Sequence, residues 1–258
     1  LAESFNEVAV QLAKAREAEQ AFLLSVSHEL KTPLTAIRGY AEGLGEGALP
    51  ADEAAATIVS ESRRLERLVQ DLLELAKLDA RRFSLDVRPT DVGEVVADTA
   101  EGFRPAAERA GLTLDVRVER GVPAASADPD RLAQVVSNLV ENALKYAATS
   151  ITVGAKAGEL WVEDDGPGIG ADDVAHVFEP FYTSSRPAAR EVGTGLGLAI
   201  VHELVEAMGG TVRAEAGAGG GTGVAGLRGP NAVAGLRGPN AVTGTRMVVT
   251  LPSARAVG

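Results

Sequence analysis

Apolar positions in the first part of the chain recur in alternating steps of four and three residues. This heptad spacing predicts a long helix with an apolar seam that requires a partner helix. Consecutive steps of four at Phe22, Val26 and Leu30 interrupt the alternation, and such an insertion locally unwinds a coiled coil. The positions before the interruption are Leu1, Phe5, Val8, Leu12 and Ala15, with Glu19 as a polar exception.

A second apolar face follows a group of helix-ending residues. Gly43, Gly45, Gly47 and Pro50 are expected to stop the first helix, and a second helix begins near Asp52. Two long helices joined by a short turn predict an antiparallel hairpin. One hairpin does not cover both apolar faces, so we expect two chains to form a four-helix bundle. The second face comprises Ile58, Leu65, Leu68, Leu72, Leu75 and Leu78.

From about Phe83 the pattern becomes a mixture of strand-like alternation and helical periodicity. Asp128 is a candidate N-cap, and Gly158 is a turn residue between two strand-like runs. The mixture predicts an α/β sandwich with one mainly antiparallel sheet, which places the whole chain in the α+β class. Strands are expected at 84–88, 112–119, 150–157, 159–164, 211–216 and 247–251, and helices at 92–109, 131–147 and 196–208.

A Gly-rich segment, 217–245, interrupts the second part. Residues 224–232 have the sequence VAGLRGPNA, and residues 233–241 repeat it without change. We expect this segment to be a mobile insertion between two strands that pair regardless of its length. The alternative is a docking arm built around Arg228 and Arg237.

Composition narrows the classes of function. The 258 residues carry a net charge of −11, and an acidic surface repels phosphates, so we expect no nucleic-acid partner. Cys is absent, which excludes disulfides, iron–sulfur clusters and zinc–cysteine sites. No apolar run approaches the length of about 18 residues that a membrane span requires. Because the heptad is already in progress at Leu1, we expect the chain to be part of a longer protein.

His28 is the first candidate for chemistry. It lies in SVSHELKTP, residues 25–33, and should point outward or to the rim of the bundle. A neutral imidazole is a competent nucleophile, and the adjacent Glu29 carboxylate can orient the ring and accept its proton. Thr32 lies one helical turn on, where its hydroxyl can position a water. The alternative is an ordinary exposed histidine, which is how we interpret His176 and His202, as surface or packing residues.

The helix over 131–147 places Asn138, Asn142 and Lys145 near one face. A polar face of this kind favours a polar ligand, because amide oxygens suit Mg²⁺ and a lysine suits phosphate. An amphipathic surface helix is the alternative.

Two glycine-containing segments complete the candidate site. In DDGPGIG, residues 164–170, a carboxylate ends a strand beside glycines that permit close approach of a ligand, which suits a base amino group, although such a string is also typical of a turn. In GTGLGL, residues 193–198, glycines lead into a helix whose amide donors suit anionic oxygen. Residues 183–192 between them carry Arg186 and Arg190 and are expected to form a mobile lid. No P-loop motif occurs, and the GxGxxG match at 221–226 has no helix after it.

The order of these segments resembles the transmitter region of two-component sensor histidine kinases over nearly the whole chain. Residues 25–37 are similar to the phospho-acceptor box, and 138–147 to the N box. Residues 164–170 and 193–200 are similar to the two glycine boxes, and 178–182 to the F box. The resemblance implies a signalling-helix linker at 1–20, a dimerisation and phosphotransfer domain at 21–82, and an ATP-binding domain of the gyrase and histidine kinase type at 83–258.

The resemblance also implies a role for each matching residue. His28 is then the phosphorylated residue, Glu29 its general base, and Thr32 the residue that assists dephosphorylation of the response regulator. Asn142 ligates Mg²⁺ with support from Asn138, and Asp164 accepts from the adenine amino group of ATP. Further nucleotide contacts are implied at Lys145, Tyr146, Gly166, Gly168, Gly193, Thr194, Gly195, Leu196 and Gly197.

One departure from the family pattern concerns a phosphate contact. Thr183 stands where the family often has arginine, so Arg186 or Arg190 is expected to make that contact. The implied partners are a second copy of the chain and a receiver domain, and the implied location is the cytoplasmic side of a membrane sensor. A catalytically weak ATP-binding scaffold and a gyrase-like ATPase are the rival functions. Retention of Glu29 and Asn142 argues against the first, and the His28 box with its heptad seam argues against the second.

Overall fold

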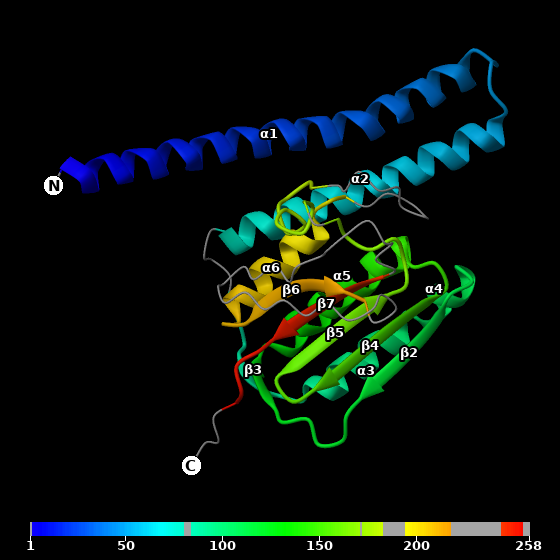
Figure 1. Ribbon diagram of the computed structural model, residues 1–258. Helices are drawn as coiled ribbons and strands as arrows, with labels where there is room; N and C mark the ends of the chain where they lie inside the picture. The colour runs from blue at the N-terminus through cyan, green and yellow to red at the C-terminus, as the bar shows by residue number, and fades with distance from the viewer. Residues whose placement is uncertain (1, 80–83, 171, 183–193, 218–243, 255–258) are drawn as a thin grey trace. The chain divides into compact units, whose positions relative to one another are not determined.

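The computed structural model describes residues 2–79, 84–170, 172–182, 194–217 and 244–254 (Figure 1). The chain divides into two compact units, 1–73 and 74–258. The domain boundaries expected from the sequence, near 20 and 82, stay predictions. None of the described helices combines the length and the apolar character that a bilayer span requires.

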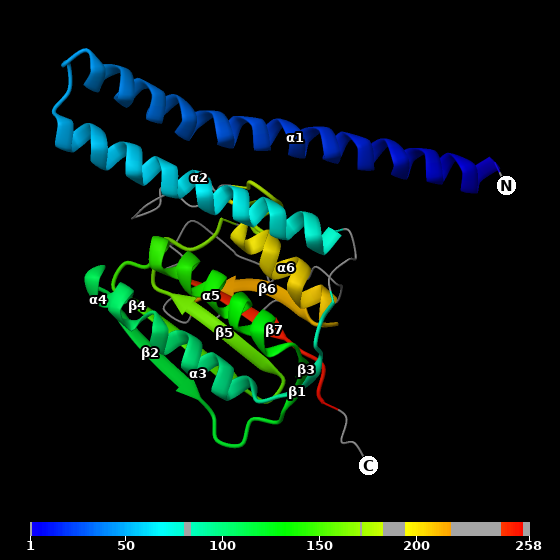
Figure 2. The same ribbon diagram turned by 180° about the vertical axis from the view of Figure 1, so that it is seen from behind.

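The first unit is a hairpin of two long helices, as predicted. Helix α1 (Ala2–Gly45) and helix α2 (Ala51–Asp79) run antiparallel, side by side in both views (Figures 1 and 2). The turn begins where expected, because Gly47 adopts a positive φ of 69° that a side chain would disfavour. The amide of Ala48 then donates to the Gly43 carbonyl over 2.9 Å, which closes the end of α1.

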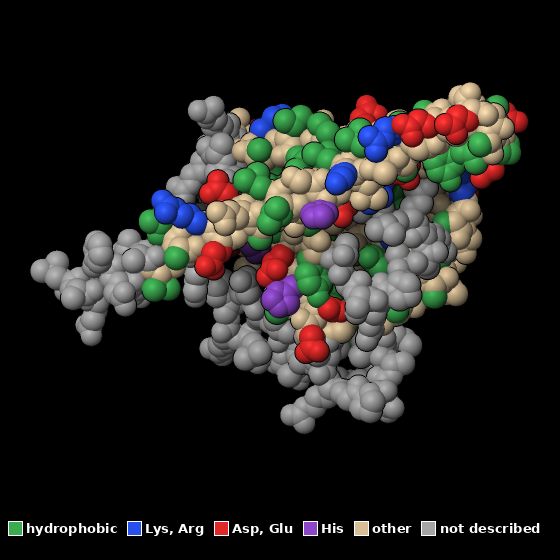
Figure 3. Space-filling view, turned by 90° about the horizontal axis from the view of Figure 1, so that it is seen from above, with side chains coloured by type: hydrophobic (Ala, Val, Ile, Leu, Met, Phe, Trp, Pro, Cys, Tyr) green, Lys and Arg blue, Asp and Glu red, His purple; other side chains and the backbone are tan. Residues whose placement is uncertain are grey.

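The hairpin leaves a large apolar surface uncovered. Figure 3 shows hydrophobic side chains gathered along its helices between charged ones. Leu24 is 63% exposed and Leu34 is 52% exposed, although leucines at helical spacing normally lie in a core. The other large exposed apolar residues here are Val10, Leu12, Leu23, Leu44, Val59, Val69 and Leu73. These side chains fit the two-chain bundle, which stays a prediction.

The second unit is a mixed sheet with helices on one face. Its strands lie in the order β2 (Thr113–Val118), β4 (Ser150–Lys156), β5 (Glu159–Asp164), β7 (Thr245–Thr250) and β6 (Thr211–Ala216). Among the strands of the described residues, only the β2–β4 pair is parallel, so the mainly antiparallel sheet is confirmed. Helices α3 (Val92–Gly102), α5 (Pro129–Tyr146) and α6 (Gly197–Ala207) cover one face, seen in front of the strands in Figure 2.

Local chemistry explains where α5 begins. Asp128 has extended backbone and its carboxylate accepts from the amides of Asp130 and Arg131 over 3.0 and 3.2 Å, so the predicted N-cap is confirmed. The same carboxylate accepts from the amide of Asp86 over 2.9 Å. One buried side chain therefore starts the helix and fixes the segment that leads into the unit.

No helix of the described residues covers the other face of the sheet. Large side chains of the strands themselves lie over this face. Trp161 of β5, only 9% exposed, lies over Gly154 of β4, where a Cβ would come within 2.2 Å of its ring. The Arg246 guanidinium lies 4.6 Å from the Trp161 ring centroid. Arg213 of β6 reaches Glu159 of β5 over 2.9 Å and thereby crosses the intervening strand. Aliphatic stems of arginines thus shield the apolar residues on this face.

Four details differ from the sequence-based expectations. The strand expected at 84–88 is wrong, since β1 covers only Arg88–Thr90 and pairs with β3 (Ala125–Ala127), which was not predicted. The helix expected at 92–109 is two helices, because α4 (Arg104–Arg109) starts anew at Phe103 with Pro105 in its first turn. The last strand begins at Thr245 and therefore takes one residue of the supposed insertion. Residues 218–243, which include the repeat, lie outside the described residues.

Candidate active site

A buried carboxylate marks the centre of the candidate site. Asp164, at the end of β5, is 7% exposed, and its carboxylate accepts from the amide of Gly166 over 2.8 Å. Burial raises the pKa of Asp164 to about 6, against the opposing effect of backbone N–H groups of Gly166 and Thr245. Such a carboxylate favours a ligand that donates hydrogen bonds to it, as an amino group does. Thr245 had no signal in the sequence, which placed it at the end of the Gly-rich segment, and it is the structure that makes it the first residue of β7.

Gly166 brings the loop after β5 against the end of α5. A Cβ at this position would lie 2.3 Å from the carbonyl oxygen of Tyr146, so only glycine permits the approach. Tyr146 itself is half-buried, and burial raises the pKa of its hydroxyl. The structure therefore brings together the predicted residues of the N box and of the first glycine box. Gly168 follows at a positive φ of 72°.

The polar face of α5 also reaches the start of α6. The Asn138 amide donates to the carbonyl of Gly197 over 3.4 Å. Asn142 lies one turn further along α5 and is half-buried, as is Lys145. Because an amide oxygen is a suitable ligand for Mg²⁺, the side chains present on this face fit the cation.

The F box packs on the second glycine box. The amide of Phe181 donates to the Gly195 carbonyl over 2.9 Å, and a Cβ on Gly195 would lie 2.9 Å from the Cα of Phe181. Phe181 is the only non-glycine residue with positive φ in the described part of the chain, at 63°. The Thr194 hydroxyl accepts from the amide of Leu196 over 3.3 Å, just before α6 starts at Gly197. Arg186, Arg190 and Gly193 lie outside the described residues.

Asp165 fixes the loop between α5 and β4. Its carboxylate accepts from the amides of Ala148, Thr149 and Ser150 and from the Thr149 hydroxyl. Burial opposes ionisation of this group, but these hydrogen bonds outweigh burial and hold its pKa well below the usual range. Adjacent carboxylates thus have opposite environments, since hydrogen bonds lower the pKa of Asp165 and burial raises that of Asp164.

The ends of the Gly-rich segment meet at Asp164. Gly217 donates to the carbonyl of Gly244 over 3.1 Å, and Gly244 donates to the carbonyl of Gly166 over 2.7 Å. Gly244 has a φ of 100°, and a Cβ there would lie 2.3 Å from the Asp164 carbonyl oxygen. The pairing of β6 with β7 on either side of the segment is confirmed.

His28 lies in the other unit, on α1, and its side chain is exposed as predicted. The hydroxyl of Thr32, one turn on, donates to the His28 carbonyl over 3.1 Å. Glu29 is half-buried and forms an ion pair with Arg64 of α2, with Nη2 and Oε2 separated by 3.2 Å. Nothing in the sequence pattern singled out Arg64, because 35 residues separate it from Glu29.

The other two histidines lie on the surface and in packing contacts, as interpreted from the sequence. His176 is exposed and its Nδ1 lies 2.7 Å from Oε1 of Glu179. His202 packs against the ring of Phe178, with centroids 5.9 Å apart. His202, Glu203 and Glu206 also bring possible metal-ligating atoms within 4.8 Å of one another on α6. Exposed acidic groups commonly come together in this way without a metal, so we assign no ion to them.

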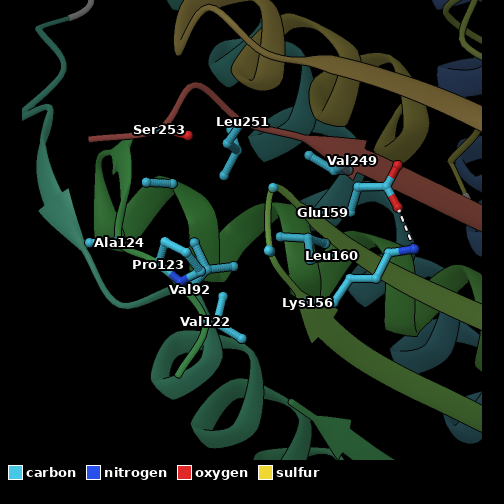
Figure 4. A pocket seen from close by; sticks show the side chains of 13 residues that line it. Val92, Val122, Pro123, Ala124, Lys156, Glu159, Leu160, Val249, Leu251 and Ser253 are labelled. Atoms are coloured by element: carbon cyan, nitrogen blue, oxygen red, sulfur yellow. Dashed lines mark ion pairs between the residues drawn. The ribbon is translucent and has the colours of Figure 1, made fainter. Parts of the chain in front are cut away.

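A cavity of about 240 Å³ lies at the end of β5 opposite Asp164 (Figure 4). Its wall is mainly apolar, and the Lys156–Glu159 ion pair of 3.0 Å lies at one side. The labelled lining residues include Val92, Val122, Pro123, Leu160, Val249 and Leu251. None of the predicted nucleotide-binding residues lines it, so this cavity is not the candidate nucleotide site.

Comparisons with known proteins agree with this arrangement. Residues 127–255 match the family of histidine kinase-, DNA gyrase B- and HSP90-like ATPases, and residues 18–81 match the His Kinase A (phospho-acceptor) domain. The signal transduction histidine-protein kinase AfsQ2 of Streptomyces coelicolor is 35% identical over 239 residues, covering 85% of this chain and 43% of the relative. The sensor histidine kinase WalK of Bacillus subtilis is 35% identical over 228 residues, covering 81% of this chain and 36% of the relative.

Solved structures give the same fold. Full-length ShkA in complex with AMPPNP is 30% identical with a TM-score of 0.60, and the match covers 93% of this chain and 47% of ShkA. The histidine kinase AdeS of Acinetobacter baumannii is 23% identical with a TM-score of 0.65, covering 88% of this chain and 98% of that one, and shows likeness of fold alone.

A helical phospho-acceptor hairpin joined to a gyrase-type ATP-binding sheet defines a class of protein, the two-component transmitters. This chain belongs to the sensor histidine kinase family. It spans less than half the length of AfsQ2 and of WalK.

Proposed function

We propose that this chain binds ATP with Mg²⁺, phosphorylates its own His28 and passes the phosphoryl group to an aspartate of a response regulator. The observation that carries the proposal is the set of contacts that join the four sequence segments, through Asn138 with Gly197, Tyr146 with Gly166 and Phe181 with Gly195. The same chain also presents an exposed histidine on a helical hairpin. A neutral imidazole is a competent nucleophile toward a phosphoryl group, and His28 presents one on the surface of the hairpin.

In the proposed reaction the imidazole nitrogen of His28 forms a bond to the γ-phosphorus of ATP. The bond from that phosphorus to the β–γ bridging oxygen breaks, and ADP leaves. Glu29 accepts the proton that the ring would otherwise retain. It is proposed for this role because it follows His28 directly, and a general base must lie within hydrogen-bond reach of the proton it removes. Thr32 positions the water that hydrolyses the phosphorylated regulator in the reverse activity.

The second unit would hold and orient the nucleotide. Asp164 accepts from the adenine amino group, while Gly166 and Gly168 let the base approach the backbone. Lys145 and Tyr146 contact phosphate or the edge of the nucleotide. The glycines at 193, 195 and 197, with Thr194 and Leu196, close over the phosphates, aided by the amide donors at the start of α6. Arg186 or Arg190 supplies the basic contact that Thr183 does not.

Mg²⁺ would be held by the Asn142 amide oxygen, with Asn138 steadying α5 against α6. When bound, the cation would neutralise part of the negative charge of the phosphates. Two chains would associate through the exposed apolar face of the hairpin, and the regulator would dock beside His28. We also propose that a membrane sensor segment precedes the chain in the full protein, which places this part in the cytoplasm.

Labelling with γ-labelled ATP tests the proposal. The parent chain should acquire an acid-labile, base-stable label, because a phosphoramidate is hydrolysed in acid and survives in alkali. His28→Gln should abolish the label and still bind an ATP analogue in calorimetric titration.

His176→Gln is the matched control, because His176 is also exposed and also lies beside a carboxylate. It should retain full labelling. Equal labelling of His28→Gln and the parent would overturn the assignment of the acceptor, and a parent that binds nucleotide without acquiring label would favour a binding scaffold.

A further inference from the structure

An ion pair between the two helices of the hairpin holds the carboxylate that follows His28. Nη2 of Arg64 on α2 lies 3.2 Å from Oε2 of Glu29 on α1. The two side chains are 25% and 36% exposed, so solvent screens the pair less than it screens a fully exposed one. The hairpin therefore carries a partly shielded charge contact one residue from the proposed phospho-acceptor.

Arg64 is itself steadied from its own helix. Its Nη1 lies 3.9 Å from Oε2 of Glu61, one turn earlier on α2. The guanidinium thus lies between two carboxylates, each near a different nitrogen. Because the fork of a guanidinium is planar and rigid, contact through one nitrogen fixes the direction in which the other points.

We propose that Arg64 is a positioning residue for histidine phosphorylation, and that it holds the Glu29 carboxylate ready to accept the proton of His28. The inference rests on the proposed role of Glu29 as general base. A glutamate side chain has three rotatable bonds, so ordering it costs conformational entropy. Pairing with Arg64 meets that cost before ATP arrives, because one carboxylate oxygen is fixed and the other is directed by the same planar group.

The pair also connects base position with helix position. Glu29 and Arg64 lie on different helices, so a movement of α1 along α2 changes their separation, whereas Glu61 moves with Arg64. An ion pair of this geometry makes the orientation of Glu29 depend on the alignment of the two helices.

Autophosphorylation kinetics of the whole chain test the proposal. Arg64→Gln should lower kcat on the order of tenfold, which is part of the 10²–10⁴-fold that a general base typically supplies, and should leave KM for ATP within about twofold. Arg63→Gln is the matched control, since Arg63 is the adjacent, exposed residue on α2 and the charge change is identical. It should keep both constants within about twofold of the parent. Arg64→Lys should recover part of the lost rate, because a lysine keeps the charge without the fork.

A double-mutant cycle separates positioning from general damage to the hairpin. In the Glu29→Gln background, Arg64→Gln should cause no further loss of rate, because the group it positions is already gone. The inference is overturned if the rate losses of the two substitutions multiply in the double variant. It is also overturned if Arg64→Gln alone keeps the full rate. If Glu29→Gln itself keeps the full rate, the role of the base is wrong and the inference falls with it. If only Glu29→Gln is impaired, the proposed function stands without Arg64.

Discussion

Asp164→Asn should make the nucleotide-free protein more stable while it weakens nucleotide binding. The substitution replaces a buried carboxylate by a neutral group of the same shape. Burial raises the pKa of Asp164 from 3.8 to about 6, and at about 1.4 kcal/mol per pH unit this difference corresponds to about 3 kcal/mol of cost for the charged form at neutral pH. Asn keeps one oxygen acceptor for the two backbone N–H groups, and the lost hydrogen bond takes back about 1–2 kcal/mol. We expect a net gain of about 1–2 kcal/mol.

The sign of the pH dependence follows from the raised pKa. The folded state holds this proton more tightly than the unfolded state, so the parent loses stability as pH rises from about 4 through about 6. The advantage of Asp164→Asn should therefore be present near pH 7.5 and absent near pH 4. Between these values it should grow steadily with pH.

Fluorescence of the single Trp, Trp161, reports on unfolding of the second unit, which contains Asp164. Trp161 lies in β5, three residues from Asp164, so its fluorescence during urea unfolding of the whole chain follows the sheet. Asp165→Asn is the matched control, because its carboxylate has a lowered pKa and accepts from three amides, and it should lose stability. An Asp164→Asn variant that is less stable than the parent at pH 7.5, or equally altered at pH 4 and pH 7.5, would refute the reasoning. Unchanged affinity for an ATP analogue would count against the adenine contact.

Three further outcomes follow from the same structure. Gly166→Ala should lower the affinity for an ATP analogue on the order of tenfold and the free energy of unfolding by about 1–3 kcal/mol, because its Cβ would meet the Tyr146 carbonyl oxygen. Calorimetric titration measures the affinity and urea unfolding the stability. An unaltered affinity would refute the close approach. Arg213→Ala should cost about 1–2 kcal/mol and shift Trp161 emission to longer wavelength, since the side chain crosses the open face of the sheet to Glu159; an unchanged spectrum would show that the shield is dispensable. Deleting residues 233–241 should change the free energy of unfolding by about 0.5 kcal/mol or less and leave autophosphorylation unchanged, because closure entropy grows only with the logarithm of loop length; a variant that unfolds or loses transfer to its regulator would show a working arm.

Features that depend on neighbours along the chain were predictable from the sequence. The helical hairpin, the Asp128 cap and the β4–β5 turn at Gly158 each follow from residues within a few positions of one another. The N box, the two glycine boxes and the F box were recognised for the same reason. The structure adds that they meet, through Asn138 with Gly197, Tyr146 with Gly166, and Phe181 with Gly195.

Features that depend on distant pairing were not predictable. Strand β3 has three residues and no alternation to read, and it exists because β1, 35 or more residues earlier, pairs with it. Thr245 reaches Asp164 only because β7 aligns beside β5. Arg64 is one of many surface-type arginines in the sequence until the hairpin brings it to Glu29. The break of the second-unit helix at Phe103 was missed although Pro105 marked it, because apolar periodicity continues through the break.

The hydrogen-bonded ends of the Gly-rich segment, Gly217 and Gly244, bear on how this gene has changed. A hydrogen bond from Gly217 to Gly244 joins the two sides, so we expect the pairing of β6 with β7 to be independent of the number of residues between them. The identical nonapeptides at 224–232 and 233–241 indicate an in-frame duplication of nine codons, and we expect it to have left the pairing of β6 with β7 in place. The same independence makes the position between Gly217 and Gly244 a natural place to splice in a fluorescent reporter, whose emission would follow events at Asp164.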